Sequence, residues 1–474
     1  MKSVKQIAKP LGRALAFCLL SWAAIAQAAT TIKPDIQAYT LDTGAQANPS
    51  TTETVAFQAV IQAAGQPSKV RVHFKSFNLG QQSYLTLTSL QDGGKQKLDR
   101  VSMNYWQSTS AIFNGDSVKL ELMVAPGEQG IQAQVDHLVV ECNCPDQVIN
   151  LNSGIRPLTL CGADSRVAST DNRVGRISGC TAWLVSNGAV LTAGHCGPVS
   201  GVFSVNVPPS SASGTPAASA PEDQYPIDTS HRTSVDNGKG DDYTVFDLLP
   251  NSTTGTRAHI RFGFFRMTRE NPAANDTIRV TGFGVDNTPA GPTANCCATD
   301  DLGNCTHPNC NAQSRTLQTA TGPYVSETVN SATNIFHSYQ TDTEPANSGS
   351  PIIWNANGFT VGIHTHGGCA SNGTGNNDGT SFENNNLEAL LQNWLGANTV
   401  YVDAVQPPTS PSEDGTVFRP FNTVTEAVTG VVNGGRIAIV EGSYTKAAGN
   451  TMLMGADGKA FTLLAPVGTV TIGD

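Results

Sequence analysis

Leu191-Thr192-Ala193-Gly194-His195-Cys196 follows the apolar run Thr181–Val185 and a turn at residues 186–188. A strand, a tight turn and a second strand that ends in histidine would place the imidazole at the rim of a β-barrel. Cys180 and Cys196 flank this hairpin, and a disulfide between them would hold the histidine in place. A histidine fixed in this way is suited to act as a general base.

A second stretch, Gly240-Asp241-Asp242-Tyr243-Thr244-Val245-Phe246-Asp247-Leu248, has a carboxylate where a strand is expected to begin. A buried carboxylate at such a point can orient a histidine and stabilise its protonated form. Asp242 fits this role best because it directly precedes the apolar run. Asp241 is the alternative, and Asp247 fits less well because it lies inside the strand.

The third stretch, Asp342-Thr343-Glu344-Pro345-Ala346-Asn347-Ser348-Gly349-Ser350-Pro351-Ile352, offers a nucleophile. A serine hydroxyl becomes reactive when a base removes its proton, and backbone N–H groups of a sharp turn can bind the oxyanion that forms. An isolated Ser-Gly-Ser is common in loops. Here it follows the histidine and the aspartate in the order His, Asp, Ser, which makes the combination specific.

These three stretches resemble the chymotrypsin family of serine peptidases, and Asn-Ser-Gly-Ser-Pro looks most like its bacterial glutamyl-endopeptidase branch. The resemblance covers residues 166–394, roughly half of the chain. It implies an all-β domain of two barrels that hydrolyses peptide bonds through an acyl-enzyme, with no cofactor. It also implies His195 as the base, Asp242 as its partner and Ser348 as the nucleophile. The N–H groups of Ala346 and Ser348 would form the oxyanion hole.

Two positions depart from the family pattern. The family usually has glycine where Ala346 stands, because the backbone turns sharply there, and alanine could misdirect the N–H group. Asn347 replaces the aspartate that, in trypsin, pairs with the N-terminus released by activation. That ion pair is therefore unavailable to this chain. If the protein is a zymogen, we expect a cut near Arg166 or Arg173 to free the enzyme from residues 29–160.

The residues expected to line the primary specificity pocket carry opposite signals. Asp342 precedes the nucleophile by six residues, where trypsin has the aspartate that binds Arg or Lys. His364 and Thr343 match positions at which the glutamyl branch binds an acidic side chain. We expect a charged P1 residue, with Arg or Lys slightly ahead of Glu, although a pairing of Asp342 with His364 would leave a neutral pocket. The remaining wall residues are Thr365, His366 and Gly367.

The beginning of the chain and its composition indicate an exported protein. A basic start and an apolar run at 15–26 are typical of a signal peptide, residues 1–28, and the run is too short to span a bilayer. Cys18 lies in this run, and the ten cysteines outside it predict up to five disulfides. A net charge of −10 without basic clusters argues against nucleic acid as a partner. We therefore expect a secreted bacterial protein, extracellular or periplasmic, with no membrane span and no metal.

Two cysteine positions carry further expectations. Cys142 and Cys144 are separated by one residue, which is poor geometry for a mutual disulfide, so one of them could tether the N-terminal region to Cys161. The family's cysteine near Glu344 is missing from this chain. Cys369 is therefore expected to pair elsewhere, for example with the cysteine cluster at 296–310.

Strand patterns and turn residues divide the rest of the chain into three parts. Residues 29–150 alternate polar and apolar side chains and predict a β-sandwich that serves as a pro-domain or a binding domain. Residues 161–397 hold the expected protease domain. Residues 398–474 resemble the opening coils of a right-handed parallel β-helix, although about three coils are usually needed for stability.

Two other functions compete with the endopeptidase. A protease-like scaffold that has lost activity could be an adhesin or bind carbohydrate, with residues 398–474 contacting glycans or a cell surface. A polysaccharide lyase is a more distant reading, because the tail lacks the charged cluster that this chemistry needs. The combination of His195, Asp242 and Ser348 favours the endopeptidase, whose partners are protein or peptide substrates.

Overall fold

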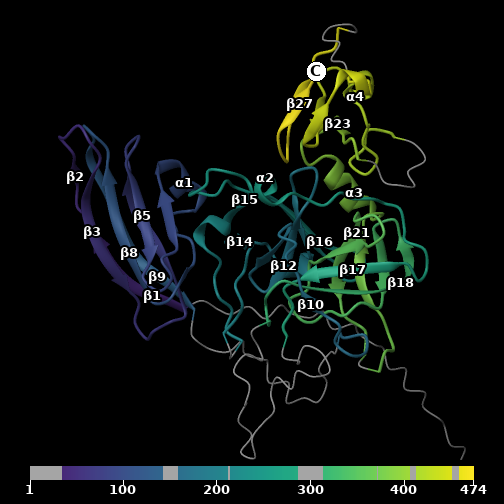
Figure 1. Ribbon diagram of the computed structural model, residues 1–474, viewed down its shortest axis with the longest axis horizontal. Helices are drawn as coiled ribbons and strands as arrows, with labels where there is room; N and C mark the ends of the chain where they lie inside the picture. The colour runs from purple at the N-terminus through teal and green to yellow at the C-terminus, as the bar shows by residue number, and fades with distance from the viewer. Residues whose placement is uncertain are drawn as a thin grey trace, which may run out of the picture.

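The computed structural model describes residues 35–141, 159–211, 214–286, 313–370, 372–405, 413–450 and 458–473. Within these ranges the protein is built mainly of strands, so the predicted all-β class is confirmed. Figure 1 shows a sandwich at one end, two barrels beside it, and a small C-terminal unit above the barrels. The expected signal peptide, Cys142, Cys144 and the cluster at 296–310 lie outside the described residues.

Residues 35–141 form two antiparallel sheets with a shared core. In β8 (Ser117–Val124), every second side chain is buried, the pattern of a strand with one face in a core. One sheet contains β1 (Asp35–Asp42), β9 (Gln129–Glu141), β4 (Lys69–Asn78), β7 (Phe113–Asn114) and, on β9, β2 (Gln46–Ala47). The other contains β3 (Thr54–Gln62), β8 (Ser117–Val124), β5 (Tyr84–Ser89) and β6 (Lys95–Leu98), followed by α1 (Arg100–Tyr105).

The next six-stranded sheet closes into a barrel, which confirms the first barrel of the predicted fold. Its strands, in the order of their pairing, are β11 (Val174–Ile177), β12 (Cys180–Leu184), β13 (Val190–Thr192), β16 (Asp242–Leu248), β15 (Gln224–Asp236) and β14 (Val202–Ser204). The first of these strands also pairs with the last. Large apolar side chains such as Phe203, Tyr225 and Phe246 fill the barrel. A short helix, α2 (Ala258–Phe262), follows it.

A second barrel is closed by the pairing of β18 with β19. It contains β18 (Gln318–Ser331), β17 (Thr277–Gly282), β20 (Pro351–Trp354), β21 (Thr360–His366), β22 (Asn377–Ser381) and β19 (Asn334–Tyr339), with β10 (Val167–Ala168) added to β18. Helix α3 (Asn385–Gln392) follows the barrel and buries Leu387 and Leu391. Among the described residues, no helix has the length and apolar character needed to cross a membrane.

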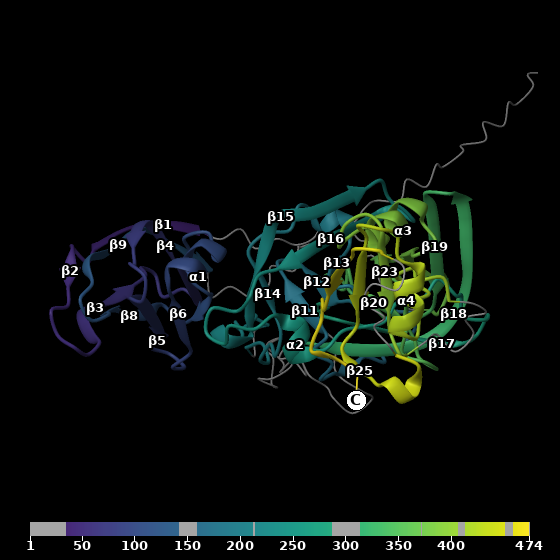
Figure 2. The ribbon, with the colours of Figure 1, turned by 90° about the horizontal axis from the view of Figure 1, so that it is seen from above.

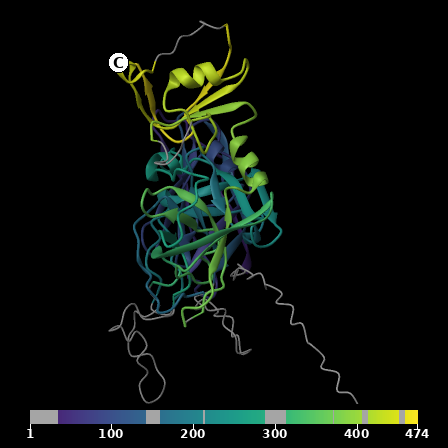
Figure 3. The ribbon, with the colours of Figure 1, turned by 90° about the vertical axis from the view of Figure 1, so that its right-hand side faces the viewer.

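The C-terminal strands pair in parallel, unlike those of the barrels. They form two small sheets, β23 (Thr399–Val402), β24 (Arg436–Ile439) and β26 (Thr462–Leu464), and β25 (Gly442–Tyr444) with β27 (Val470–Ile472), next to α4 (Val424–Gly430). Figures 1 and 3 show this unit on top of the barrels, where Asp403 accepts two hydrogen bonds from Arg266. Parallel pairing is expected within a β-helix, and the β-helix itself stays a prediction.

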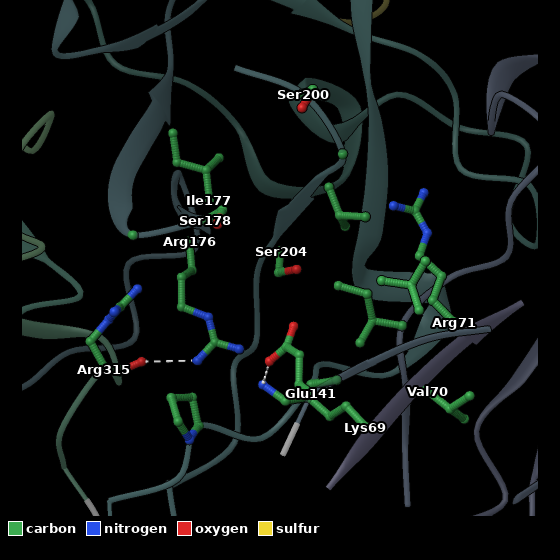
Figure 4. A pocket seen from close by; sticks show the side chains of 17 residues that line it. Lys69, Val70, Arg71, Glu141, Arg176, Ile177, Ser178, Ser200, Ser204 and Arg315 are labelled. Carbon is green, nitrogen blue, oxygen red and sulfur yellow. Dashed lines mark hydrogen bonds and ion pairs between the residues drawn. The ribbon is translucent and has the colours of Figure 1, made fainter. Parts of the chain in front are cut away.

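The sandwich lies against the first barrel, on the side of β14 and β15 (Figure 2). A pocket of about 270 Å³ lies between the sandwich and the first barrel (Figure 4). Its lining includes Lys69, Arg71, Arg176 and Arg315. Lys69 pairs with Glu141 there. The pocket reaches Ser178 and Gly179 but contains none of the three predicted catalytic residues, so it belongs to the interface.

Candidate active site

His195 lies in a single helical turn, Gly194–Cys196, directly after β13. Cys196 forms a disulfide with Cys180 at the start of β12, which closes the hairpin. A Cβ atom on Gly194 would lie 1.7 Å from the carbonyl oxygen of Val235, so only glycine fits beside that strand. These constraints fix the imidazole at the edge of the first barrel.

Asp242 begins β16 and directs its buried carboxylate at this turn. Its Oδ2 atom lies 2.7 Å from Nδ1 of His195, and its Oδ1 atom accepts hydrogen bonds from the backbone N–H groups of His195, at 3.0 Å, and Gly194. Burial lowers the pKa of His195, but the hydrogen bond and the charge of Asp242 outweigh it, so the pKa is raised above its usual value. Nε2 is then free to exchange a proton.

The two alternative carboxylates have other partners. Asp241 accepts hydrogen bonds from the side chains of Asn237 and Asn384. Asp247 lies 2.6 Å from Nδ1 of His231 and accepts a hydrogen bond from the indole of Trp394. Of the three aspartates considered, Asp242 is therefore the one hydrogen-bonded to His195.

Ser348 lies in the loop between β19 and β20, packed against the hairpin of His195. Its carbonyl oxygen accepts a hydrogen bond of 2.9 Å from the N–H of Thr181. Gly349 has a φ of +88°, and a Cβ atom there would lie 2.1 Å from Oγ1 of Thr192, so this contact also requires glycine. Nε2 of His195 is buried and has no hydrogen-bond partner among the described residues. No hydrogen bond therefore joins the Ser348 hydroxyl to this nitrogen. Catalytic hydrogen bonds are often long or poorly aligned in free enzymes, so the pair is not excluded by this.

The loop before Ser348 has the conformation that normally selects glycine. Ala346 has a φ of +79°, in the left-handed region. Its carbonyl oxygen accepts a hydrogen bond of 3.0 Å from Oγ1 of Thr181. Within the described ranges, neither the N–H of Ala346 nor that of Ser348 has a protein acceptor. Both donors are thus open to an oxygen atom of a ligand.

Comparison with known proteins agrees with this geometry, since the Trypsin family model matches residues 163–378. These residues are a trypsin-family domain. It is the domain of a serine endopeptidase, and its substrates are proteins or peptides. No curated protein matches the chain.

Solved structures of proteases also resemble the chain. A Glu endopeptidase in complex with MPD is 18% identical, covers 48% of this chain and 95% of its own, and has a TM-score of 0.32. The thermostable serine protease AL20 from an extremophilic microorganism is 16% identical over 45% and 92%, with a TM-score of 0.30. Protease Anisep from Arthrobacter nicotinovorans is 16% identical over 46% and 93%, also with a TM-score of 0.30.

In the trypsin-family domain, Asp342 is bound by the segment that precedes β10. Its carboxylate accepts hydrogen bonds from the N–H of Cys161 at 2.7 Å and from the N–H and hydroxyl of Ser165 at 2.8 and 2.6 Å. Cys161 forms a disulfide with Cys369. The expectations that Cys369 pairs with the cluster at 296–310 and that Cys161 receives the tether from the N-terminal cysteines are wrong, because the folded segment brings Cys161 to Cys369.

His364 lies on β21 and is buried beside Tyr339, whose hydroxyl is 2.6 Å from its Nδ1 atom. Burial lowers the pKa of His364 to about 3, and the charges of His366 and His195 act in the same direction. Asp342 and His364 each have their own partners and do not pair with each other. The pairing that would neutralise the pocket is therefore not formed.

The other predicted wall residues lie around these two. The hydroxyl of Thr343 accepts a hydrogen bond of 3.0 Å from Asn377. His366 has its Nδ1 atom 2.8 Å from the hydroxyl of Thr365 and 3.9 Å from Oδ2 of Asp242. A Cβ atom on Gly367 would lie 1.9 Å from Cγ2 of Thr159, so Thr159 occupies the space beside that wall.

Two residues important to this geometry were missed from the sequence. Thr181 binds both Ala346 and Ser348 and also accepts a hydrogen bond from the N–H of Phe283. Arg166, predicted only as a cleavage position, is buried beside the loop at 340–350 that holds Ser348, here called the nucleophile loop. These contacts join residues more than 100 positions apart, and no local pattern in a single sequence indicates them.

Proposed function

We propose that this protein is an exported serine endopeptidase in which His195, Asp242 and Ser348 form the catalytic triad. The observation that carries the proposal is the carboxylate of Asp242 on Nδ1 of His195, with the second ring nitrogen unpaired and Ser348 on the adjoining loop. The disulfides Cys161–Cys369 and Cys180–Cys196 support an oxidising compartment. A contact of residues 398–474 with glycans stays a prediction.

The proposed reaction follows from the positions of the donors and acceptors. Nε2 of His195 takes the proton of the Ser348 hydroxyl while Oγ attacks the carbonyl carbon of the substrate. The oxyanion accepts hydrogen bonds from the N–H groups of Ala346 and Ser348. His195 then gives its proton to the leaving amine, and water, activated by the same histidine, hydrolyses the acyl-enzyme.

For the P1 residue, the charges favour Arg or Lys over Glu. His364, with a pKa of about 3, is uncharged at neutral pH and offers no positive charge to a glutamate. Asp342 accepts three hydrogen bonds, and all three come from neutral donors. A carboxylate bound only by neutral donors can still attract a basic side chain.

Labelling with a fluorophosphonate tests the triad directly. We expect the full chain to be labelled on one serine, with labelling abolished in Ser348→Ala and slowed strongly in His195→Ala. Peptide anilides that differ only at P1, with Lys, Arg, Gln or Glu, test the pocket. A folded wild-type chain that is not labelled would refute the catalytic proposal, and a preference for Glu would refute the proposed role of Asp342.

A further inference from the structure

The guanidinium of Arg166 lies beneath the nucleophile loop in a site built of carboxylates and a carbonyl group. Its side chain is 2% exposed. Asp164 accepts two hydrogen bonds from it, at 3.0 Å from Nε and 2.7 Å from Nη2, and Asp286 lies 3.5 Å from Nη2. Nη1 donates a hydrogen bond of 2.8 Å to the carbonyl oxygen of Val285. Arg166 thus binds two separate segments at once.

The site of Arg166 is connected to the nucleophile loop through a backbone hydrogen bond. The N–H of Val285 donates a hydrogen bond of 2.8 Å to the carbonyl oxygen of Pro345, the residue before Ala346. A Cβ atom placed on Gly284 would lie 2.0 Å from Oδ1 of Asn347 and 3.2 Å from Nη1 of Arg166. The guanidinium and the residue before the nucleophile therefore meet at one glycine.

The charges around Arg166 hold it in the ionised form. Burial lowers the pKa of Arg166, but the hydrogen bonds of Asp164 and the charges of Asp286 and Glu344 outweigh this, so the pKa is raised. Glu344 belongs to the nucleophile loop, and its negative charge attracts the guanidinium. Because the cation is buried, water screens this attraction little.

We propose that Arg166 is a positioning residue that holds the nucleophile loop in its catalytic shape while the chain is uncut. The proposal rests on the assignment of Ser348 as the nucleophile. It replaces the expectation of an activating cut near Arg166, because a buried side chain with this many partners is not available to a protease. Arg166 touches no substrate, and it acts through Val285 and Pro345 on Ala346.

Arg173 provides a matched control because it has the same local sequence pattern. Asp171 lies two residues before Arg173, as Asp164 does before Arg166, and accepts two hydrogen bonds from it at 2.7 and 2.6 Å. Arg173, however, is 33% exposed and lies over the ring of Phe265, away from the loop. Removing it deletes an equivalent ion pair without touching the connection to Ala346.

The test compares Arg166→Gln and Arg166→Lys with Arg173→Gln. We expect Arg166→Gln to lower kcat and the rate of fluorophosphonate labelling about 10²-fold, as the loss of an oxyanion donor does, with KM changed by less than about threefold, as expected when only the transition state loses an interaction. Arg166→Lys keeps the charge and should recover part of the loss. It also serves as the test if the glutamine variant does not fold. Arg173→Gln should stay within about twofold of wild type.

Two results would overturn the proposed role of Arg166 without affecting the proposed triad. One is labelling of folded Arg166→Gln and Arg166→Lys at the wild-type rate. Another is labelling only of molecules that mass spectrometry finds cut between residues 160 and 173. Failure of the triad gives a different result, namely a wild type that is not labelled or a Ser348→Ala variant that is.

A second, independent inference concerns His73, Asp136 and His137 on the outer face of the sandwich. His73 pairs with His137 across β4 and β9, whereas the next pair is Phe74 with Val135. Asp136 is therefore an extra residue on β9, and this bulge turns its side chain to the face of the two histidines. Oδ1 of Asp136 lies 2.6 Å from Nδ1 of His73 and 2.9 Å from Nδ1 of His137.

This cluster has the chemistry of a transition-metal site. One atom from each of the three side chains lies within 4.8 Å of the others. Two imidazoles and one carboxylate, with water in the fourth position, are a frequent ligand set of Zn²⁺. All three side chains are between 26% and 38% exposed, so an ion can enter from solvent. We infer that the bulge at Asp136 builds a site for Zn²⁺ or a similar divalent ion.

Titration calorimetry of chelator-treated Ser348→Ala with zinc chloride tests this site. We expect one bound ion, with affinity at least tenfold weaker in His73→Ala, His137→Ala and Asp136→Asn. His231→Ala is the control, because His231 also contacts an aspartate but belongs to no cluster of three possible ligands among the described residues. Unchanged binding in the three variants, or no binding at 0.1 mM zinc, would refute the inference.

Discussion

At the scale of single residues, Asp242 sets the protonation of His195, the proposed base. Its carboxylate accepts hydrogen bonds from the imidazole of His195 and from the backbone of the same turn. It therefore fixes the ring and favours its protonated form, which is the form that appears during acyl transfer. The raised pKa of His195 is the measurable consequence.

We predict that kcat/KM falls as the pH is lowered through the pKa of His195, above the usual value of 6.5. Asp242→Asn removes the contributions that raise this pKa, so the acidic limb should move to lower pH while kcat falls about 10⁴-fold. Because the pKa is raised on folding, the pair stabilises the fold at acidic pH and loses this effect as pH rises through the folded value. Asp247→Asn should leave the profile unchanged. An acidic limb that stays in place in Asp242→Asn would contradict the assignment.

Ala346 gives a second prediction at this scale. An alanine with a φ of +79° is strained by about 1 kcal/mol relative to glycine. Ala346→Gly should therefore raise the free energy of unfolding by about 1 kcal/mol, measured by denaturant titration, without a loss of kcat. A clear decrease in stability would show that the side chain of Ala346 contributes packing that outweighs the strain.

At the scale of elements, the segment before β10 and the loop after β21 are joined through Cys161 and Cys369. Their disulfide joins residues separated by 208 positions, and the N–H of Cys161 binds Asp342. The segment thus contacts the proposed specificity pocket through Asp342, although it lies at the edge of the trypsin-family match. A change that loosens this segment should therefore also change the shape of the pocket.

The double variant Cys161→Ser, Cys369→Ser tests this coupling. We expect the free energy of unfolding to fall by about 2–5 kcal/mol, and the affinity for benzamidine, a small cation that mimics an arginine side chain, to weaken. Ser165→Ala, which removes one hydrogen bond to Asp342 but keeps the disulfide, is the control for the local contact. Unchanged benzamidine affinity in the double variant would separate the segment from the pocket.

The same elements explain how far the sequence alone can lead. The hairpin that leads to His195, the aspartate that begins β16 and the loop of Ser348 are contiguous patterns, and each could be located from its own residues. The disulfide Cys161–Cys369, the hydrogen bond of Thr181 to Ala346 and that of Arg166 to Val285 arise only when distant segments meet. The bulge at Asp136 depends on register between strands, which alternation of side chains does not reveal.

At the scale of the whole molecule, the sandwich is joined to the trypsin-family domain by partly buried hydrogen bonds. The amide of Gln224, on β15, binds both the N–H and the carbonyl oxygen of Ile112, at 2.9 and 2.8 Å. Asn114 binds the N–H and the carbonyl oxygen of Ala218 in the same way, at 2.8 and 3.0 Å. Val202 of the barrel packs in the core of the sandwich. Such an interface is expected to persist in the active protein.

We therefore predict that the sandwich and the barrels unfold together in one calorimetric transition. Gln224→Ala leaves the partly buried backbone groups of Ile112 without their partners, so it should destabilise the protein by about 1–3 kcal/mol and let the sandwich melt separately. Gln107→Ala is the matched control, because Gln107 crosses the same interface to Thr229 at an exposed position and should change stability by less than about 0.5 kcal/mol. Two transitions in the wild type would mean that the sandwich folds alone and can leave the enzyme, as a pro-domain does.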